Sequence, residues 1–242
     1  MQDSIKGNGH VAILGLGPSV RQFLEITKRN GGRRQFCDEV WGINCLGDVF
    51  VCDKVFHMDD VRVQEIRTAA RPESNIAHML KWLRTYQGEV ITSRAHPDYP
   101  CLREFPLEAV LNEFPNAYFN STAAYAVAYA IHKGATKISC FGMDFTYPDA
   151  NDAEKGRACV EFWLGHASAR GIALSVPKTT SLLDAYYPVE KRYYGYDCVE
   201  LVFERSAAGV KVDFKPRDKL PTADEVEAAY DHSKHPNALV ES

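Results

Sequence analysis

The chain has 242 residues, of which 45% are hydrophobic and 25% charged, as in a globular protein with one ordinary domain or one domain and a small appendage. A net charge of -4 excludes a broad basic field for nucleic acid, and no apolar run reaches membrane-spanning length. Met1–His10 does not resemble a signal peptide, and the 7 cysteines form no C-x-x-C pair, so we expect a cytoplasmic protein with reduced thiols.

The first predicted element is a strand that ends in a glycine-rich turn, within Val11–Ser19. Four apolar residues in a row are typical of a strand buried on both faces of a parallel sheet. Gly15 and Gly17 would let the backbone approach a ligand. Pro18 suits the first turn of a helix, and Ser19 can cap the free amides there. Exposed amides and a helix dipole favour a phosphate, although plain α/β architecture also explains the pattern.

The second predicted strand, Val40–Asn44, ends on an amide and not on an acid. A nicotinamide dinucleotide fingerprint needs a third glycine in the first turn and an acidic residue near this strand end. Val20 and Asn44 stand at those places, which argues against NAD. Asn44 either binds a base or sugar or caps the following turn.

The third predicted strand, within Lys54–Asp60, delivers Asp59 and Asp60 at its carboxyl end. Paired acids are costly unless they are solvated, share a proton or are bridged by a cation, so Mg²⁺ bound with substrate phosphates fits this pattern. The alternative is that Asp60 merely caps a helix beginning near Val61. His57 lies on the same strand, where a lone histidine is more often structural than catalytic.

The middle of the chain predicts a helix over 72–86, a strand over 89–93 and a proline-rich surface excursion over 97–115. A second informative block follows, in which polar residues precede an alanine-rich helix over 123–132 and a strand over 137–142 ends in glycine, a carboxylate and an aromatic. We expect these residues to converge on the pocket opened by the glycine turn. They are Asn120, Ser121, Thr122, Gly142, Asp144 and Tyr147.

A long helix over 154–170 and a last core strand over 172–176 complete the predicted α/β unit. We therefore divide the chain into a Rossmann-like nucleotide-binding domain, 1–184, and an aromatic-rich lid, β-hairpin and polar tail, 185–242. The fold class is α/β, with a mostly parallel sheet and helices on both faces. Tyrosines mixed with Lys191 and Arg192 predict a lid or a homo-oligomer contact, with stacking on bases or sugars as the alternative. Strands at 199–203 and 210–214 predict the hairpin, and we expect a short helix at 222–230 and a fraying end.

Four motifs in chain order resemble a known superfamily: Gly15–Ser19, Trp41–Asn44, Asn120–Thr122 and Phe141–Phe145. They are similar to the bacterial lipooligosaccharide sialyltransferases, which use a CMP-sugar. They are also similar to the 6-hydroxymethyl-dihydropterin pyrophosphokinase (MptE)-like proteins, which use ATP and Mg²⁺. The second group has phage members, so a phage-type protein acting on a modified nucleobase or a surface glycan is one interpretation. The resemblance covers roughly the first three quarters of the chain.

The resemblance implies that the glycine turn lines the nucleotide's phosphates, that Asn44 touches the sugar or base, and that Asp144 lies at the pocket floor. The nucleotide-binding residues that it implies are Gly15, Gly17, Pro18, Ser19, Asn44, Asn120, Ser121, Thr122 and Gly142. The chain departs from the sialyltransferases at Leu16, where they commonly have asparagine. Their lid histidine also has no secure counterpart, because His166 is the only histidine between Asp144 and the carboxyl tail and its helical placement favours a structural role.

Together these patterns favour a nucleotide-dependent transferase, first of all a glycosyltransferase with a nucleotide-sugar donor and a hydroxyl acceptor. Asp59, Asp144 and His166 are the candidate bases, and Tyr147 can hydrogen-bond the leaving phosphate. One alternative is pyrophosphoryl transfer from ATP with Mg²⁺ on Asp59 and Asp60 or on Asp144. Another is a protein that binds or senses a nucleotide without turnover. Nucleic acid stays open as an acceptor.

Overall fold

The computed structural model describes residues 5–115, 117–188, 192–196, 198–217 and 219–229. Its chain contacts separate two compact units, Met1–Tyr186 and Tyr187–Ser242. Among the described helices, none combines the length and apolar character needed to cross a bilayer. Lys191 and the polar end beyond residue 229, where we expect fraying, lie outside the described residues.

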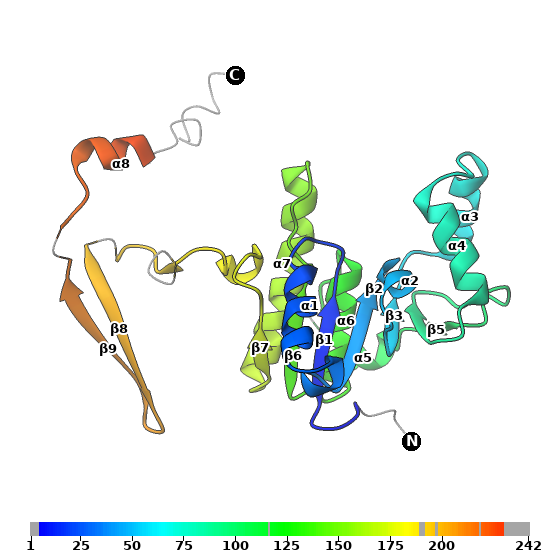
Figure 1. Ribbon diagram of the computed structural model, residues 1–242, viewed down its shortest axis with the longest axis horizontal. Helices are drawn as coiled ribbons and strands as arrows, with labels where there is room; N and C mark the ends of the chain where they lie inside the picture. Colours follow the sequence, from blue (N-terminus) through cyan, green and yellow to red (C-terminus); the bar gives the residue numbers. More distant parts are fainter. Residues whose placement is uncertain (1–4, 116, 189–191, 197, 218, 230–242) are drawn as a thin grey trace. The chain divides into compact units, whose positions relative to one another are not determined.

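The first unit is built on a parallel sheet of seven strands in the order β5-β4-β3-β2-β1-β6-β7 (Figure 1). The strands are β1 (His10–Leu14), β2 (Glu39–Ile43), β3 (Lys54–Phe56), β4 (Val90–Thr92), β5 (Leu102–Glu104), β6 (Lys137–Phe141) and β7 (Ala173–Ser175). This confirms the Rossmann-like α/β class. Because β2 to β5 extend from one side of β1 and β6 from the other, the strand order reverses at β1, where such sheets open a crevice beyond the carboxyl ends.

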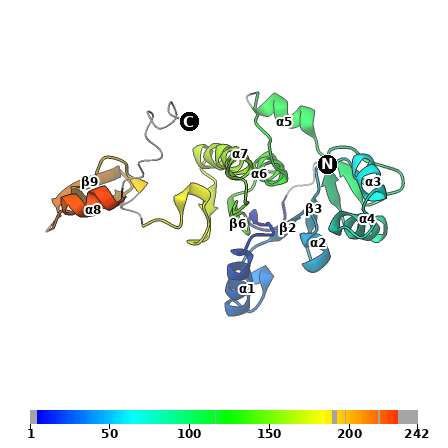
Figure 2. The same ribbon diagram turned by 90° about the horizontal axis from the view of Figure 1, so that it is seen from above.

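Helices cover both faces of this sheet, as Figure 2 shows: α6 and α7 lie on one face and α1 and α2 on the other. The alternation along β1 explains the two layers, because Val11 and Ile13 pack in the core cluster of α6 and α7 while Ala12 and Leu14 pack in the cluster of α1. The helices of this unit are α1 (Val20–Arg29), α2 (Leu46–Val49), α3 (Val61–Ala69), α4 (Asn75–Thr85), α5 (Leu107–Glu113), α6 (Thr122–His132) and α7 (Ala150–Ala169).

Two outer strands differ from the sequence prediction. Strand β5 lies inside the proline-rich stretch expected to be a surface excursion, and it pairs with β4 through three residues. Strand β7 pairs only with β6 and is partly exposed, so it is an edge strand and not a core strand. Three-residue strands carry too little periodicity to be read from sequence, because their pairing partner decides whether they form.

The second unit contains a hairpin of β8 (Val199–Ser206) and β9 (Gly209–Pro216), followed by α8 (Ala223–Ala229). Leu201 pairs with Phe214 and Phe203 with Val212, so these apolar side chains share one face of the hairpin. Homo-oligomerisation through the tyrosine-rich segment stays a prediction.

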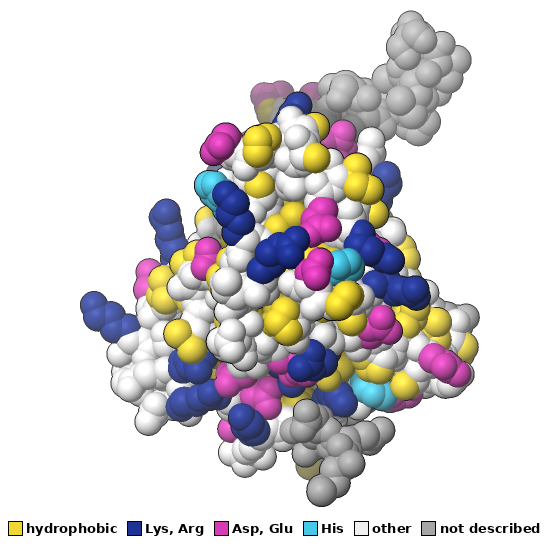
Figure 3. All heavy atoms as spheres, turned by 90° about the vertical axis from the view of Figure 1, so that its right-hand side faces the viewer, with side chains coloured by type: hydrophobic (Ala, Val, Ile, Leu, Met, Phe, Trp, Pro, Cys, Tyr) yellow, Lys and Arg dark blue, Asp and Glu magenta, His cyan; other side chains and the backbone are white. Residues whose placement is uncertain are grey.

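The outer face of the first unit near α3 and α4 mixes charges of both signs (Figure 3). Ion pairs such as Arg62 with Asp60 and Arg84 with Glu65 account for part of this mixture. This face therefore offers no single-sign field for a polyanion.

Candidate functional site

Two strand ends interlock at the centre of the sheet, where β1 and β6 run side by side. The Gly15 amide donates to the Phe141 carbonyl at 2.7 Å, and the Gly17 amide donates to the carbonyl of Gly142, just after β6, at 2.8 Å. A Cβ atom on Gly15 would collide with the carbonyl oxygen of Gly142, and a Cβ atom on Gly142 would collide with that of Gly15. Gly142 also has a φ of +68°, which glycine adopts most readily. Glycine is therefore required where the two loops meet.

Two buried residues, Ser19 and Asp144, also connect the turn after β1 to the loop after β6. The Ser19 amide donates to Oδ2 of Asp144 at 2.8 Å, and the Gly142 amide donates to Oγ of Ser19 at 2.7 Å. Only 4% of Ser19 and 3% of Asp144 are exposed. The Ser19 side chain does not cap α1 as the sequence predicts, because its oxygen is engaged by the loop after β6. Asp144 supplies the acceptor at the amino end of α1.

The glycine turn keeps nearly all of its amide hydrogens for the chain itself. Gly15, Gly17 and Ser19 donate as described, Pro18 has no amide hydrogen, and the amides of residues 20–22 donate to the carbonyls of residues 17–19. Within this fully described turn, the Leu16 amide is the one without an acceptor. The predicted row of exposed amides for a phosphate is therefore wrong, since these glycines serve backbone packing.

A pocket of about 590 Å³ opens beyond the carboxyl ends of β1, β2 and β6. Most of the predicted site residues line it: Gly15, Gly17, Pro18, Asn44, Asp59, Asn120, Ser121, Thr122, Gly142, Asp144 and Tyr147. Asp60 and His166 are outside this lining, and Ser19 is buried behind it. None of the described residues that line the pocket is a lysine, arginine or histidine. Charge for an anion must therefore come from the backbone.

The amino end of α6 supplies such backbone charge. Ser121 is the N-cap, and its Oγ accepts from the Ala124 amide at 3.3 Å. The amides of Thr122 and Ala123 find no acceptor in the described chain, and both residues line the pocket. An eleven-residue helix directs the positive end of its dipole here. An anion in this pocket would therefore find free amides at the start of α6 and not at the glycine turn.

Asp144, one of the residues that line the pocket, carries an oxygen atom without a hydrogen-bond partner. Its Oδ1 is buried and has no hydrogen-bond partner among the described residues. A buried acceptor without a donor costs about 1–3 kcal/mol. A hydroxyl or amine hydrogen of a ligand would remove that cost.

The end of β2 holds Asn44 in an unusual backbone conformation with a φ of +53°. Its amide donates to the Phe56 carbonyl at 2.8 Å, and its Oδ1 lies 3.2 Å from Nδ1 of His57. On the other side of the ring, Nε2 of His57 lies 3.0 Å from Oε1 of Gln64 in α3. No sequence pattern points to Gln64, because only the docking of α3 turns this polar residue inward.

The two acids after β3 do not act together. Asp60 accepts from the Arg62 amide at 3.0 Å and pairs with the Arg62 guanidinium, whose hydrogen bond lowers the pKa of Asp60 to about 2. Asp59 lines the pocket, with a side chain that is 58% exposed. The described residues contain no group of three or more histidine, cysteine or acidic side chains placed to hold a metal. The predicted Mg²⁺ site on Asp59 and Asp60 is not supported, and the capping interpretation of Asp60 describes what the structure has.

His166 lies outside the pocket, within an aromatic cluster. Its ring centroid is 4.6 Å from that of Phe162 and 5.6 Å from that of Phe114. Gly156, on the same helix, lines the pocket, and ten residues of α-helix separate it from His166 by about 15 Å. This position does not support His166 as a base.

Tyr147 stands at the rim of the pocket and is 59% exposed. The neighbouring Phe145 has a φ of +47° and packs edge-on against Tyr147, with ring centroids 6.3 Å apart. Both residues also line an adjoining hollow of about 610 Å³ along α7. A second substrate entering this hollow would approach the pocket past Tyr147.

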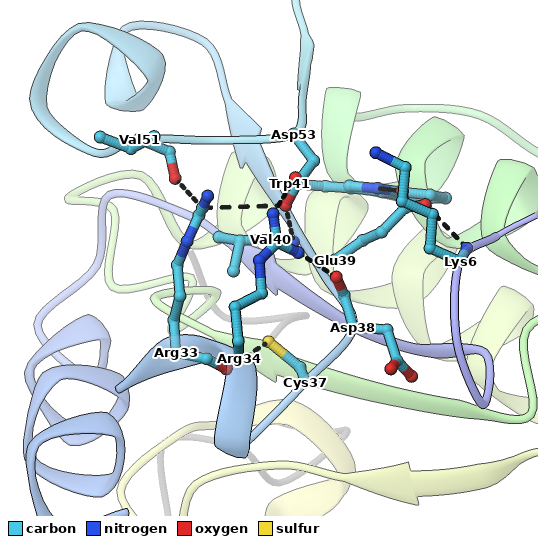
Figure 4. Close-up of polar contacts among 10 residues, drawn as sticks. All are labelled: Lys6, Arg33, Arg34, Cys37, Asp38, Glu39, Val40, Trp41, Val51 and Asp53. Carbon is cyan, nitrogen blue, oxygen red and sulfur yellow. Dashed lines mark hydrogen bonds and ion pairs between the residues drawn. The ribbon is translucent and has the colours of Figure 1, made fainter. Parts of the chain in front are cut away.

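A second polar cluster lies at the opposite, amino-terminal end of β2 (Figure 4). Asp53 accepts from the Val40 amide at 2.8 Å and pairs with Arg33 and Arg34. Glu39 accepts from the Trp41 indole at 2.7 Å. Both carboxylates thus have hydrogen-bond partners within the chain, and this cluster holds the start of β2 in place.

Comparison with solved structures finds sialyltransferases. The monofunctional α-2,3-sialyltransferase Cst-I from Campylobacter jejuni is similar with a TM-score of 0.47 and 14% identity, over 100% of this chain and 95% of that one. The sialyltransferase CstII from Campylobacter jejuni, in complex with the substrate analogue CMP-3FNeuAc, gives 0.40 and 17%, over 69% and 79%. No family model and no curated protein matches the chain. With identities and TM-scores this low, the assignment of a function depends on the site itself.

Proposed function

We propose that this protein is a glycosyltransferase whose nucleotide-sugar donor binds in the pocket beyond β1, β2 and β6. The observation that carries the proposal is the convergence of the four sequence motifs on one cavity, into which α6 directs free amides. Those motifs resemble the CMP-sugar-dependent sialyltransferases. Ligands of doubly wound sheets bind at this place.

The donor's phosphate belongs at the amides of Thr122 and Ala123 in this proposal. The ribose or base then lies over Asp144, and a rotation of this side chain brings its buried, unpartnered Oδ1 to a hydroxyl or amine hydrogen of the ligand. Asn44 also lines the pocket, and we assign it a hydrogen bond to the same ligand. The unpartnered amides of Thr122 and Ala123 and Oδ1 of Asp144 thereby gain partners.

The charge of the pocket favours a donor with a single phosphate. Asp59, Asp144 and Asp152 line it, and no described cationic side chain does. Two amides and a helix dipole can balance about half an elementary charge, far less than a triphosphate carries. A nucleoside monophosphate sugar therefore fits this lining better than ATP does.

For transfer, an acceptor hydroxyl must lose its proton while the phosphate leaves. Asp59 and Asp152 are the exposed carboxylates that line the pocket, and we assign the role of base to Asp59, which follows a strand of the central sheet. Tyr147 donates a hydrogen bond to the leaving phosphate, which carries new negative charge. The acceptor occupies the hollow along α7 that shares Phe145 and Tyr147 with the pocket.

The test is a thermal-shift and calorimetric series with CMP, a CMP-sugar, UDP-sugars and ATP, each with and without Mg²⁺. We expect CMP and its sugar to raise the melting temperature without added metal, and a sugar acceptor to yield product by mass spectrometry. Stabilisation by ATP alone, and only with Mg²⁺, would instead favour pyrophosphoryl transfer. Tight nucleotide uptake without any product would favour a sensor.

A further inference from the structure

His57 is a buried histidine that lies just behind the pocket and does not line it. Only 1% of it is exposed, and both ring nitrogens are occupied. Nδ1 lies 3.2 Å from Oδ1 of Asn44, and Nε2 lies 3.0 Å from Oε1 of Gln64. Asn44 lines the pocket, whereas His57 and Gln64 do not. The ring therefore connects α3 to the pocket through one carboxamide.

The backbone of Asn44 is fixed, whereas its side-chain amide contacts only the His57 ring among the hydrogen-bond partners in the described residues. The residue is fixed by its hydrogen bond to Phe56 and by its left-handed φ. Its Nδ2 makes no hydrogen bond within the described part of the chain. Half a turn of the carboxamide would exchange a donor for an acceptor at the pocket wall. His57 thus decides which atom a ligand meets.

A neutral imidazole has one hydrogen to share between these two carboxamides. Burial lowers the pKa of His57, against the opposing effect of the Asp59 carboxylate, so the neutral form is favoured at pH 7. With one hydrogen, the ring can donate to only one of the two amides and must accept from the other. The tautomer therefore sets the orientation of Asn44.

The one charged group that the structure records beside the ring selects between the tautomers. Oδ2 of Asp59 lies 3.9 Å from Nδ1, and no charged side chain faces Nε2 among the described contacts. A negative charge on that side favours the hydrogen on Nδ1. Nδ1–H then donates to Oδ1 of Asn44, as the structure places these atoms. Gln64 must in that case present its amide nitrogen to Nε2, which reverses the amide orientation in the structure, where Oε1 faces the ring.

We propose that His57, anchored by Gln64, is a positioning residue that holds the Asn44 carboxamide with its NH₂ group toward the pocket. Asn44 then presents a donor, which suits a carbonyl or phosphate oxygen of the ligand and disfavours a ligand amine at that point. This inference rests on the proposed function for the identity of the ligand, but not for the tautomer itself.

Two substitutions with matched polarity test the role. In His57→Asn the amide nitrogen occupies the place of Nδ1 and keeps a donor facing Asn44; in His57→Gln it reaches the place of Nε2 and leaves Asn44 without one. We expect His57→Asn to bind CMP within about three-fold of the unmodified protein and His57→Gln to bind about ten-fold more weakly. Equal affinities in both variants, or the reverse order, would overturn the proposal.

Nitrogen NMR of the unmodified protein provides a readout that needs no ligand and no variant. We expect the His57 ring to carry its hydrogen on Nδ1, with Nε2 bare. A spectrum with the hydrogen on Nε2 would overturn the positioning role, whatever the ligand. If the Nδ1 tautomer is found but neither CMP nor any other nucleotide binds, the positioning of Asn44 stands and the proposed function fails.

Discussion

At the scale of single residues, Asp144 performs two tasks with its two oxygens. Oδ2 holds the amide of Ser19 and joins the start of α1 to the loop after β6. Oδ1 is buried without a partner among the described residues, and we propose that the ligand supplies one. We therefore expect the Asp144 carboxylate to affect both the stability of the sheet's centre and ligand binding in the pocket.

Replacing Asp144 by alanine should reduce both stability and binding. Loss of an acceptor at a helix start costs about 1–2 kcal/mol of the free energy of unfolding, and loss of the pocket oxygen should weaken CMP binding about ten-fold. Ser74→Ala is the matched control, because Ser74 caps α4 and does not line the pocket. Chemical denaturation and calorimetry measure the two effects. Equal loss of CMP affinity in both variants would show that Asp144 acts through stability alone.

At the scale of elements, the start of α6 and the crossing of two loops define the site. Thr122 is the first residue of α6, a position that tolerates proline, and Ser121 has the extended backbone that precedes proline well. Thr122→Pro therefore deletes one amide hydrogen and keeps the helix. We expect CMP affinity to fall about ten-fold, with the melting temperature nearly unchanged. Thr122→Ala, which keeps the amide, should bind more tightly than Thr122→Pro in the same titration.

The loop crossing makes a prediction about Gly142. Gly142→Ala adds a Cβ to a left-handed residue and drives it into the Gly15 carbonyl, so we expect a loss of about 3 kcal/mol or more in the free energy of unfolding. Gly134 has a similar φ of +78° with open space around it, so Gly134→Ala should cost only about 1–2 kcal/mol. Urea denaturation of Gly142→Ala and Gly134→Ala compares their free energies of unfolding. The difference separates the cost of the steric clash with Gly15 from the cost of backbone strain. A similar cost for both would mean that the loops can move apart.

The central elements could be predicted because they are apolar, patterned and bounded by glycine or polar caps. Strands β1 and β6 and helix α6 follow those signals, and the motifs at their ends meet in the pocket. The sequence could not show which amides of the glycine turn would be free to bind a ligand. The acceptor for Ser19 comes from Asp144, 125 positions away, and no local pattern reports such a partner. The same holds for Gln64, which reaches His57 only after α3 docks.

At the scale of the whole molecule, the described lining of the pocket belongs to one unit. The lining residues run from Gly15 to Gly156, all inside Met1–Tyr186. The sequence predicted that the tyrosine-rich segment after this unit forms a lid, but no residue of that segment is among the described lining residues. A fragment of residues 1–186 should therefore fold, with a melting temperature within a few degrees of the full chain, and bind CMP equally well. Calorimetry on the fragment and the full chain checks this. A clear loss of CMP affinity in a folded fragment would assign the remaining residues a part in the site.

The pocket floor joins the ends of β1 and β6, so it cannot form before residues 137–142 have been synthesised. During synthesis, Gly15 leaves the ribosome long before Gly142 is added, and the early strands wait without their central neighbour. A ligand of this pocket would therefore bind only chains in which β6 has paired with β1, and not nascent or truncated chains. The fraction of chains that bind it would then measure the fraction that has folded completely.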